Sequence, residues 1–240
     1  MSPHGSEKNL LQASNHHLTT PRDFENTVYF DRWAKAYDHG RISRWFQYTQ
    51  NLAINAMSLR KDAKVLDVGC GTGFAVLQVA GLVPEGCACG IDISPNMIEQ
   101  ACRKVPPALS HRVEFREGNA TQIPYPDECF DNLLCTNSFH HYPDPLLALR
   151  EMQRVLKPGG QLVILENAPD LSWYTWLWDR VLRVIEKGHV QYYPSRELGD
   201  LLRRAALAQV RLCHLRNERF KHGKLFASLQ LWSGRKPGPF

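Results

Sequence analysis

Apolar residues along this chain alternate between short runs of β-branched and aliphatic residues and longer stretches with helical spacing. The short runs predict five strands, Lys64–Val68, Cys87–Ile91, Arg112–Arg116, Phe130–Thr136 and Gln161–Glu166. Between them, Ser94-Pro95 and Asp144-Pro145 each combine an N-cap side chain with proline at the first helical position. Strands that alternate with helices predict a parallel, doubly wound α/β sheet with right-handed crossovers.

The N-terminal end of the chain departs from this alternation. Residues 1–27 are polar and predict a flexible tail. The aromatic and aliphatic positions of residues 28–60 predict two helices joined near His39-Gly40, which would form an N-terminal cap. No second core is apparent, so residues 28–240 are predicted to form a single domain.

The C-terminal end carries an aromatic helix and a hairpin. The helix, Ser172–Lys187, lies in a predicted helical insertion over residues 170–195. A further helix is predicted after an N-cap at Ser195. Two final strands, Val210–Leu215 and Lys224–Trp232, are predicted to pair.

The aromatic helix is apolar over most of its circumference. Its narrow polar stripe consists of Thr175, Asp179, Arg183 and Glu186. A helix of this kind needs a cover. The sheet and the N-terminal helices could provide it, or segment 171–187 could be a lid over a hydrophobic substrate, a membrane contact or a dimer interface. No oligomeric state follows from the sequence.

Composition and charge favour a cytoplasmic protein, with peripheral membrane contact as an open alternative. The N-terminus has no apolar signal segment, and no apolar run approaches the roughly 18 residues of a membrane span. The seven cysteines contain no C-x-x-C pair, which favours reduced thiols and no metal site. Residues 170–240 hold 13 Lys and Arg against 6 Asp and Glu, so this basic region could meet nucleic acid or an anionic membrane, or simply be solvated.

A glycine-rich loop after the first predicted strand is the main candidate for ligand binding. The run Val65-Leu66-Asp67-Val68-Gly69-Cys70-Gly71-Thr72-Gly73 ends a strand in an acid and opens a helix at Phe74–Ala80. It lacks the third glycine spacing of the dinucleotide fingerprint and the Gly-Lys-Ser/Thr end of a P-loop. The loop therefore predicts a ligand with a ribose and an adenine but little negative charge.

Polar residues after the next two strands suit the two parts of such a ligand. Asp92 lies 23 residues after Gly69, where the ribose-binding acid of these folds is expected, although it could instead cap the Ser94 helix. In Gly118-Asn119-Ala120, the Asn119 side-chain oxygen can accept from the adenine amine and the Ala120 backbone N–H can donate to the ring. Three apolar residues, Ile93, Met97 and Ile123, can enclose the base.

These motifs together resemble class I S-adenosylmethionine-dependent methyltransferases, in particular the small-molecule branch with the ubiquinone and menaquinone biosynthesis enzymes. The resemblance covers about residues 30–170, in the segments Val65–Gly73, Asp92, Gly118–Ala120, Phe130-Asp131 and Arg154–Gly160. It implies a Rossmann-like seven-stranded sheet with an antiparallel last strand.

The resemblance also assigns the cofactor site. Gly69, Gly71 and Gly73 would line the methionine part of S-adenosyl-L-methionine, with Asp67 and Asn137 nearby. Asp92 would bind the ribose, and Asn119 with Ala120 the adenine. The adenine position is often Asp in this family, so the neutral Asn119 predicts weaker binding and not a lost site.

Candidate catalytic residues lie in two other segments. His140 and His141 follow the fourth strand in a loop expected to face the methyl group, where either could be a general base. Packing or a backbone hydrogen bond explains them equally well. Tyr37 lies in a segment that resembles one folding over the cofactor in relatives, where it could close the site, contact the sulfonium or serve as a core aromatic.

The expected activity is in-line transfer of a methyl group to a small aromatic or lipophilic molecule. Two alternatives stay open. A nucleic-acid methyltransferase would suit the basic C-terminal region, but the only Pro-Pro pair, Pro106-Pro107, does not form the signature for base amino groups. A non-catalytic module that binds the cofactor or a partner is the other.

Overall fold

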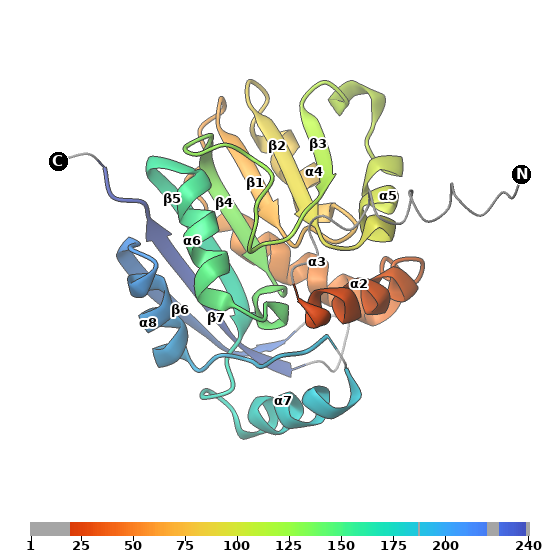
Figure 1. Ribbon diagram of the computed structural model, residues 1–240, viewed down its shortest axis with the longest axis vertical. Helices are drawn as coiled ribbons and strands as arrows, with labels where there is room; N and C mark the ends of the chain where they lie inside the picture. The colour runs from red at the N-terminus through yellow and green to blue at the C-terminus, as the bar shows by residue number, and fades with distance from the viewer. Residues whose placement is uncertain (1–19, 187, 220–225, 239–240) are drawn as a thin grey trace, which may run out of the picture.

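The computed structural model describes residues 20–186, 188–219 and 226–238. Seven strands form one sheet in the order β3-β2-β1-β4-β5-β7-β6, with helices against both faces (Figure 1). The strands are β1 (Lys64–Val68), β2 (Cys87–Asp92), β3 (Val113–Glu117), β4 (Phe130–Thr136), β5 (Leu156–Asn167), β6 (Ala208–Arg219) and β7 (Phe226–Arg235). The α-helices are α2 (Pro21–Trp33), α3 (Gly40–Asn55), α4 (Phe74–Leu82), α5 (Pro95–Arg103), α6 (Pro145–Val155), α7 (Trp173–Ile185) and α8 (Ser195–Arg204).

The sheet is parallel from β3 to β5, and β7 runs antiparallel between β5 and β6. The predicted Rossmann-like sheet with an antiparallel last strand is therefore confirmed. Two sequence-predicted caps are also confirmed, because Ser94 Oγ accepts from the Met97 backbone N–H at 3.1 Å and Asp144 Oδ1 accepts from Leu147 N–H at 2.9 Å.

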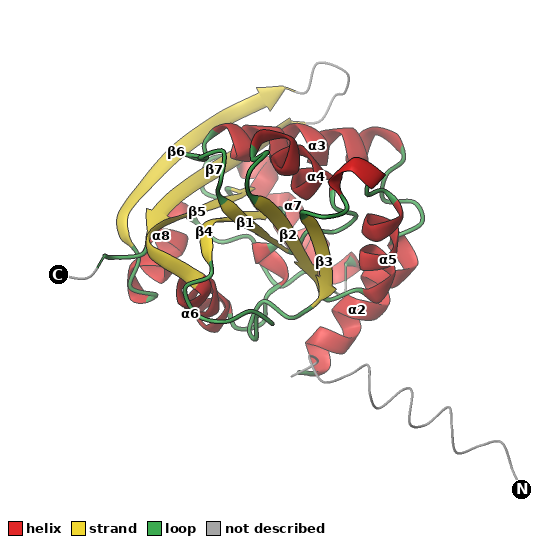
Figure 2. Cartoon of the chain, turned by 90° about the horizontal axis from the view of Figure 1, so that it is seen from above, coloured by secondary structure: helices red, strands yellow, loops and turns green. Residues whose placement is uncertain are grey.

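Each central strand supplies side chains to two cores, because successive side chains point to opposite faces. In β1, Leu66 and Val68 join the core beneath α6 and α8, whereas Val65 joins the core beneath α3 and α4. Figure 2 shows these helix pairs on opposite sides of the sheet. This arrangement fixes the carboxyl ends of β1, β2 and β4 side by side.

Some sequence predictions at the ends of elements are wrong. The tail predicted over residues 1–27 is helical from Pro21, where a capping box joins Thr20 and Asp23; residues 1–19 lie outside the described residues. Ser195 is the first residue of α8 and not its N-cap; its side chain donates to Asp170 instead. Strand β5 begins at Leu156, five residues before its predicted start, because pairing to β4 continues through a register shift.

The orientation of α7 is the reverse of the one its polar stripe suggests. Thr175 and Asp179 are buried, and the tryptophans and aliphatic residues of the opposite face are exposed. The sheet and the N-terminal helices therefore do not cover this apolar face. No helix in the described part of the chain has the length and apolar character needed to cross a membrane.

Candidate active site

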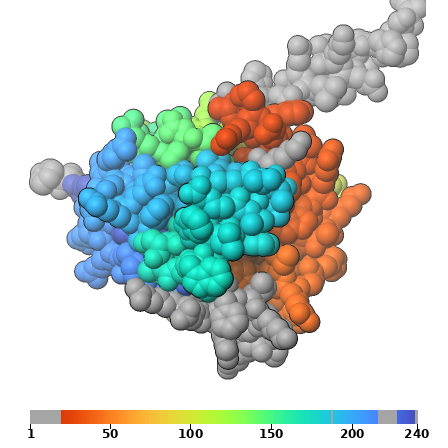
Figure 3. Space-filling view, turned by 90° about the horizontal axis from the view of Figure 1, so that it is seen from below, coloured from red at the N-terminus to blue at the C-terminus, as the bar shows by residue number. Residues whose placement is uncertain are grey.

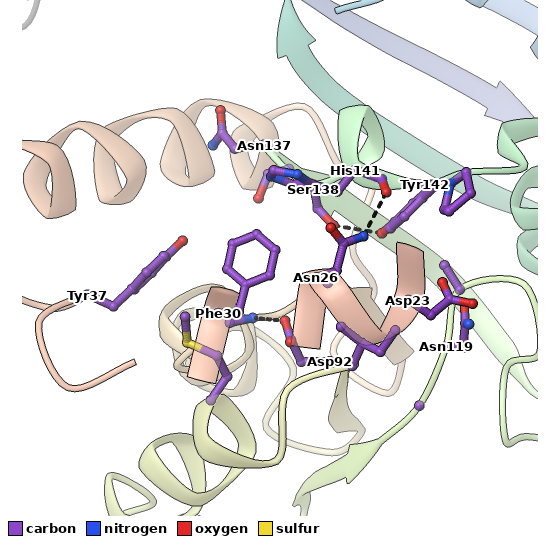
Figure 4. Close-up of a pocket in the computed structure, with 18 residues that line it drawn as sticks. Asp23, Asn26, Phe30, Tyr37, Asp92, Asn119, Asn137, Ser138, His141 and Tyr142 are labelled. Atoms are coloured by element: carbon purple, nitrogen blue, oxygen red, sulfur yellow. Dashed lines mark hydrogen bonds between the residues drawn. The ribbon is translucent and has the colours of Figure 1, made fainter. Parts of the chain in front are cut away.

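A pocket opens at the carboxyl ends of β1, β2 and β4, where the strand order reverses between β1 and β4. The residues that line it surround about 650 Å³ of space, part of which is open to solvent. The predicted residues that line it are Tyr37, Gly69, Gly71, Asp92, Ile93, Met97, Asn119, Ala120, Asn137 and His141 (Figure 4). Four other predicted residues, Asp67, Gly73, Ile123 and His140, lie outside its lining.

Asp92, at the end of β2, presents an organised carboxylate to the pocket. Its Oδ2 accepts from Gly71 N–H at 2.9 Å and its Oδ1 from Ser94 N–H at 3.0 Å. Each oxygen keeps a second lone pair for a ligand hydroxyl. Burial raises the pKa of Asp92 to about 6, while the Ser94 and Gly71 N–H groups limit the rise. Asp92 therefore lines the pocket and braces the glycine loop, whereas the N-cap of α5 is Ser94 and not Asp92.

Asp67 lies at the end of β1, buried beside this site. Neither of its carboxylate oxygens has a hydrogen-bond partner among the described residues. Burial, followed by the nearby charge of Asp92, raises the pKa of Asp67 to about 8. A buried carboxyl without a donor is costly. A cationic ligand above the glycine loop would relieve that cost, which fits a sulfonium cofactor.

Two glycines let the loop approach its neighbours closely, each on a different side. Gly69 has φ +77°, and a Cβ there would lie 1.9 Å from Ser138 Oγ, so only glycine lets the loop reach the β4 side of the pocket. Gly73 has φ +82°, and a Cβ there would lie 2.5 Å from the Phe115 ring. Gly73 therefore serves the contact between the loop and β3, away from the pocket.

Asn119, the predicted acceptor for the adenine amine, is hydrogen-bonded within its own loop. The Asn119 side-chain oxygen accepts from Thr121 N–H at 3.0 Å and from Thr121 Oγ at 2.9 Å, so the predicted acceptor is engaged within its own loop. Figure 4 shows Asp23 of α2 turned toward Asn119. Asp23 is buried and lines the pocket. A carboxylate thus lies where the sequence suggested only a neutral amide.

Helix α2 forms a roof over the pocket. The sequence predicted a cap helix only from residue 28 and did not place Asp23, Asn26 or Phe30 in the site. Asn26 Nδ2 donates to the His141 carbonyl at 3.1 Å, and Phe30 lines the pocket on the same helix (Figure 4). At the other end, Asp31 accepts from Ser94 Oγ at 2.6 Å. The capping box at Thr20 was the available sequence signal for this helix.

Tyr37 covers the glycine loop. Its ring stacks on Phe46 with 5.4 Å between centroids and lies 3.6 Å from where a Gly71 Cβ would be. Burial, and then the charges of Asp92 and Asp67, raise the pKa of Tyr37 far above its ordinary value. The phenol therefore stays protonated, so it can close the site and donate or accept a hydrogen bond, but it cannot act as an anionic base.

The two histidines of the loop have different surroundings. His140 Nδ1 bonds to Glu166 Oε2 at 2.8 Å, and the Phe139 N–H donates to the other Glu166 oxygen at 2.7 Å. His140 is buried behind the pocket wall, and burial lowers its pKa well below the ordinary value. These contacts give His140 a supporting role in the wall.

His141 faces the pocket itself. Its Nδ1 lies 2.9 Å from the Gly188 carbonyl oxygen, which can only accept, so Nδ1 carries the proton and Nε2 keeps its lone pair. The ring meets Phe30 edge to face at 4.9 Å. Burial, followed by the neighbouring His140, lowers the pKa of His141 well below its ordinary value. The neutral ring is therefore an acceptor at the pocket wall.

Asn137 completes the wall between these groups. It adopts φ +50°, a left-handed conformation that asparagine tolerates, and its Nδ2 donates to Thr49 Oγ at 2.8 Å. Its Oδ1 is buried with no donor among the described residues. Such an orphaned acceptor in a pocket lining suits an ammonium group. Across the described ranges, no group of three or more His, Cys, Asp or Glu could hold a metal ion.

Comparison with known proteins identifies relatives of this chain. A family model described as "Methyltransferase domain" matches residues 59–184. The demethylmenaquinone methyltransferase of Listeria welshimeri is 35% identical over 158 residues, which are 65% of this chain and 65% of that enzyme. The enzyme of the same name from Geobacillus stearothermophilus is 32% identical over 210 residues, 79% of this chain and 88% of that enzyme.

Solved structures share the fold at lower identity. A SAM-dependent methyltransferase from Thermotoga maritima superposes with a TM-score of 0.68 at 20% identity, over 87% of this chain and 99% of that one. The phosphoethanolamine N-methyltransferase 2 of Haemonchus contortus, solved with S-adenosyl-L-methionine, gives 0.69 at 17% identity, over 92% of this chain and 60% of that one.

Proposed function

The chain belongs to the class I S-adenosylmethionine-dependent methyltransferases, and from this premise we propose that it methylates a small, lipophilic aromatic molecule of the hydroquinone class. When bound, the cofactor supplies a methyl group on a sulfonium, which reacts as an electrophile. An electron-rich ring is the matching acceptor, and a hydroquinone is richer in electrons than its quinone. The demethylmenaquinone methyltransferases among its relatives support this class.

The residues of the pocket suit the cofactor part by part. We assign the ribose hydroxyls to Asp92 and the adenine amine to Asp23 beside Asn119, with Ile93 and Met97 against the base. Several further groups match the cationic methionine end: the loop at Gly69 and Gly71, the buried Asn137 Oδ1 and, behind the lining, the buried Asp67 carboxyl without a donor. Within the protein these buried acceptors have no donor, and the positive charge of the cofactor would satisfy them.

His141 is the proposed proton acceptor. The hydroxyl of the acceptor would lose its proton to Nε2 as the ring carbon takes the methyl group, and the bond from methyl to sulfur would break so that the cofactor leaves as a neutral thioether. Loss of the proton on the methylated ring carbon would then restore the aromatic ring. Hydrogen bonds to the Gly188 carbonyl and around His140–Glu166 hold the loop in place, and α2 excludes water from above. One observation carries the proposal: Asp92 and His141 line the same pocket, and His141 Nε2, 3.9 Å from the nearest Glu186 oxygen, carries no proton.

A lipophilic acceptor of this class partitions into membranes. The proposal therefore includes peripheral contact of the protein with a membrane surface, where it would meet its acceptor.

Transfer of labelled methyl groups tests the proposal. The panel contains a naphthohydroquinone with a short isoprenoid chain, its oxidised quinone, a simple phenol, an amine, a thiol and transfer RNA. We expect label in the hydroquinone and almost none in the quinone, because only the reduced ring is a nucleophile. Label in the amine, the thiol or the RNA instead would overturn the acceptor class.

A further inference from the structure

We propose that the outward face of α7 is a docking surface for an anionic lipid bilayer. This face consists of Trp173, Trp176, Leu177, Arg180 and Val184, flanked by Trp178 and Ile185. Its five central residues follow the spacing i, i+3, i+4, i+7, i+11, which places them on one stripe of the helix. Of the eleven exposed large hydrophobic residues in the described chain, six lie on α7, so they form a patch and are not scattered.

The fold holds α7 in this orientation from the inside. Asp179 is buried and accepts from Arg183 at 2.7 Å, His189 Nε2 at 2.8 Å and the Tyr192 N–H at 2.6 Å. Against burial, which raises it, these hydrogen bonds keep the pKa of Asp179 below its ordinary value. Rotating α7 to bury its tryptophans would break this anchor. The exposure of the apolar face is therefore built into the structure.

The charge on the face favours a bilayer over a second copy of the chain. Arg180 lies in the middle of the apolar stripe, with its guanidinium 5.2 Å from the centre of the Trp176 ring. A dry interface between two copies would bury this charge, which is costly without an acidic partner. At a bilayer, tryptophan suits the level of the headgroups and arginine meets lipid phosphate. The net charge of +5 adds a general attraction to anionic lipids.

The docking surface adjoins the pocket. Figure 3 shows α7 and part of α2 on one face of the molecule. The segment after α7 returns to the pocket wall, where Val190 N–H donates to the His140 carbonyl at 3.0 Å and Gly188 holds His141. A bilayer beneath α7 would bring a membrane-dissolved acceptor close to the roofed pocket. This last point rests on the proposed function, whereas the docking surface itself does not.

Sedimentation of the full chain with lipid vesicles tests the surface. We expect the protein to pellet with vesicles of phosphatidylcholine mixed with phosphatidylglycerol, and less with phosphatidylcholine alone. The double variant Trp176→Ser, Leu177→Ser should weaken binding by at least about tenfold, because it removes two apolar side chains that would insert into the bilayer. Arg180→Gln should weaken binding to the anionic vesicles by about fivefold.

A matched control carries the same number of changes elsewhere. Leu82→Ser with Leu147→Ser alters two exposed leucines on α4 and α6 and should bind as the unaltered protein does. Circular dichroism and Tm confirm that each variant is folded. Failure of the unaltered protein to pellet with anionic vesicles, or equal binding by the Trp176/Leu177 variant, would overturn the proposal. So would sedimentation velocity without lipid, if it showed a dimer that this variant converts to monomer.

A parallel assay separates this inference from the proposed function. Methyl transfer to a water-soluble hydroquinone should proceed equally in the unaltered protein and in the Trp176/Leu177 variant. Activity without vesicle binding would reject the docking surface and the membrane contact, and leave the proposed acceptor class standing. Vesicle binding without hydroquinone methylation would support the surface and reject the proposed acceptor.

Discussion

The floor of the pocket and the helices beside it follow different structural rules. The floor consists of strand ends, where Gly69, Gly71 and Asp92 are placed by a regular parallel sheet. Helices α2 and α7 instead bury polar residues: Asp23 and Asn26 in α2 and Asp179 in α7. The floor thus organises a ligand with backbone geometry, whereas each helix turns its polar side inward, α2 toward the pocket and α7 toward an internal anchor. The hydrophobic pattern of the sequence therefore predicts the strands of the floor correctly, but it does not predict which face of these helices points inward.

The largest effect should come from the floor. Asp92→Ala removes the ribose acceptor and leaves the Gly71 and Ser94 N–H groups without their acceptor. Charge-assisted hydrogen bonds contribute about 1.5–3 kcal/mol each, so we expect the Kd for S-adenosylmethionine to rise about 100-fold or more. Isothermal titration measures this. A Kd within about threefold of the unaltered protein, well short of the loss of even one such bond, would contradict the assigned ribose site.

His141→Ala tests whether the pocket wall beneath α2 supplies the proton acceptor. At saturating cofactor and acceptor, the rate should fall about 100-fold, with the cofactor Kd unchanged. His140→Ala is the comparison. It should lower Tm, because it leaves the buried Glu166 Oε2 without its hydrogen-bond partner. A rate for His141→Ala near that of the unaltered protein would remove this histidine from the mechanism.

The pH profile of the same rate has a definite sign. His141 accepts a proton only when neutral, and burial lowers its pKa well below the ordinary value. The rate at saturation should therefore stay level from about pH 8 to about pH 6.5 and fall only in more acid solution. A rate that halves already near pH 6.5 would show a base with an ordinary histidine pKa, which contradicts the assignment to the buried His141.

Asp23→Asn asks whether α2 contributes to ligand binding or only covers it. Loss of one charged acceptor for the adenine amine should raise the cofactor Kd about tenfold. Glu25→Gln, at an exposed position of the same helix, is the matched control and should leave the Kd unchanged. Asp23 also belongs to the capping box with Thr20, so the Tm of both variants is measured to distinguish a loss of cofactor contact from a loss of helix stability. Equal cofactor affinities for the two variants would mean that α2 is only a roof.

The smallest effect concerns Asp67, which should cost stability in the absence of ligand. Its pKa in the folded protein is about 8, above the ordinary value of 3.8, so the folded state binds the extra proton and loses stability as pH rises between these values. Asp67→Asn should therefore raise Tm by a few degrees at about pH 8, and the gain should vanish toward about pH 4. A Tm difference that does not depend on pH would show that Asp67 is not the buried acid described.

The sequence predicted the floor well because local backbone rules determine it. The bounds of β1 and β4 match their prediction, and Asp92 lies in the pocket because a strand end and a glycine loop leave few other arrangements. The pattern could not show that Thr121 engages Asn119 or that Glu166 holds His140, since these contacts depend on tertiary placement. The inward face of α7 was missed for another reason: Asp179 is buried through partners outside its own helix.

A crystal structure of the protein with S-adenosylmethionine bound tests the central claim most directly. The account predicts ribose hydroxyls on the Asp92 carboxylate, adenine between Ile93 and Met97 beside Asp23, and the methyl group open toward His141. Cofactor density at another surface, or a ribose that makes no contact with Asp92, would contradict it.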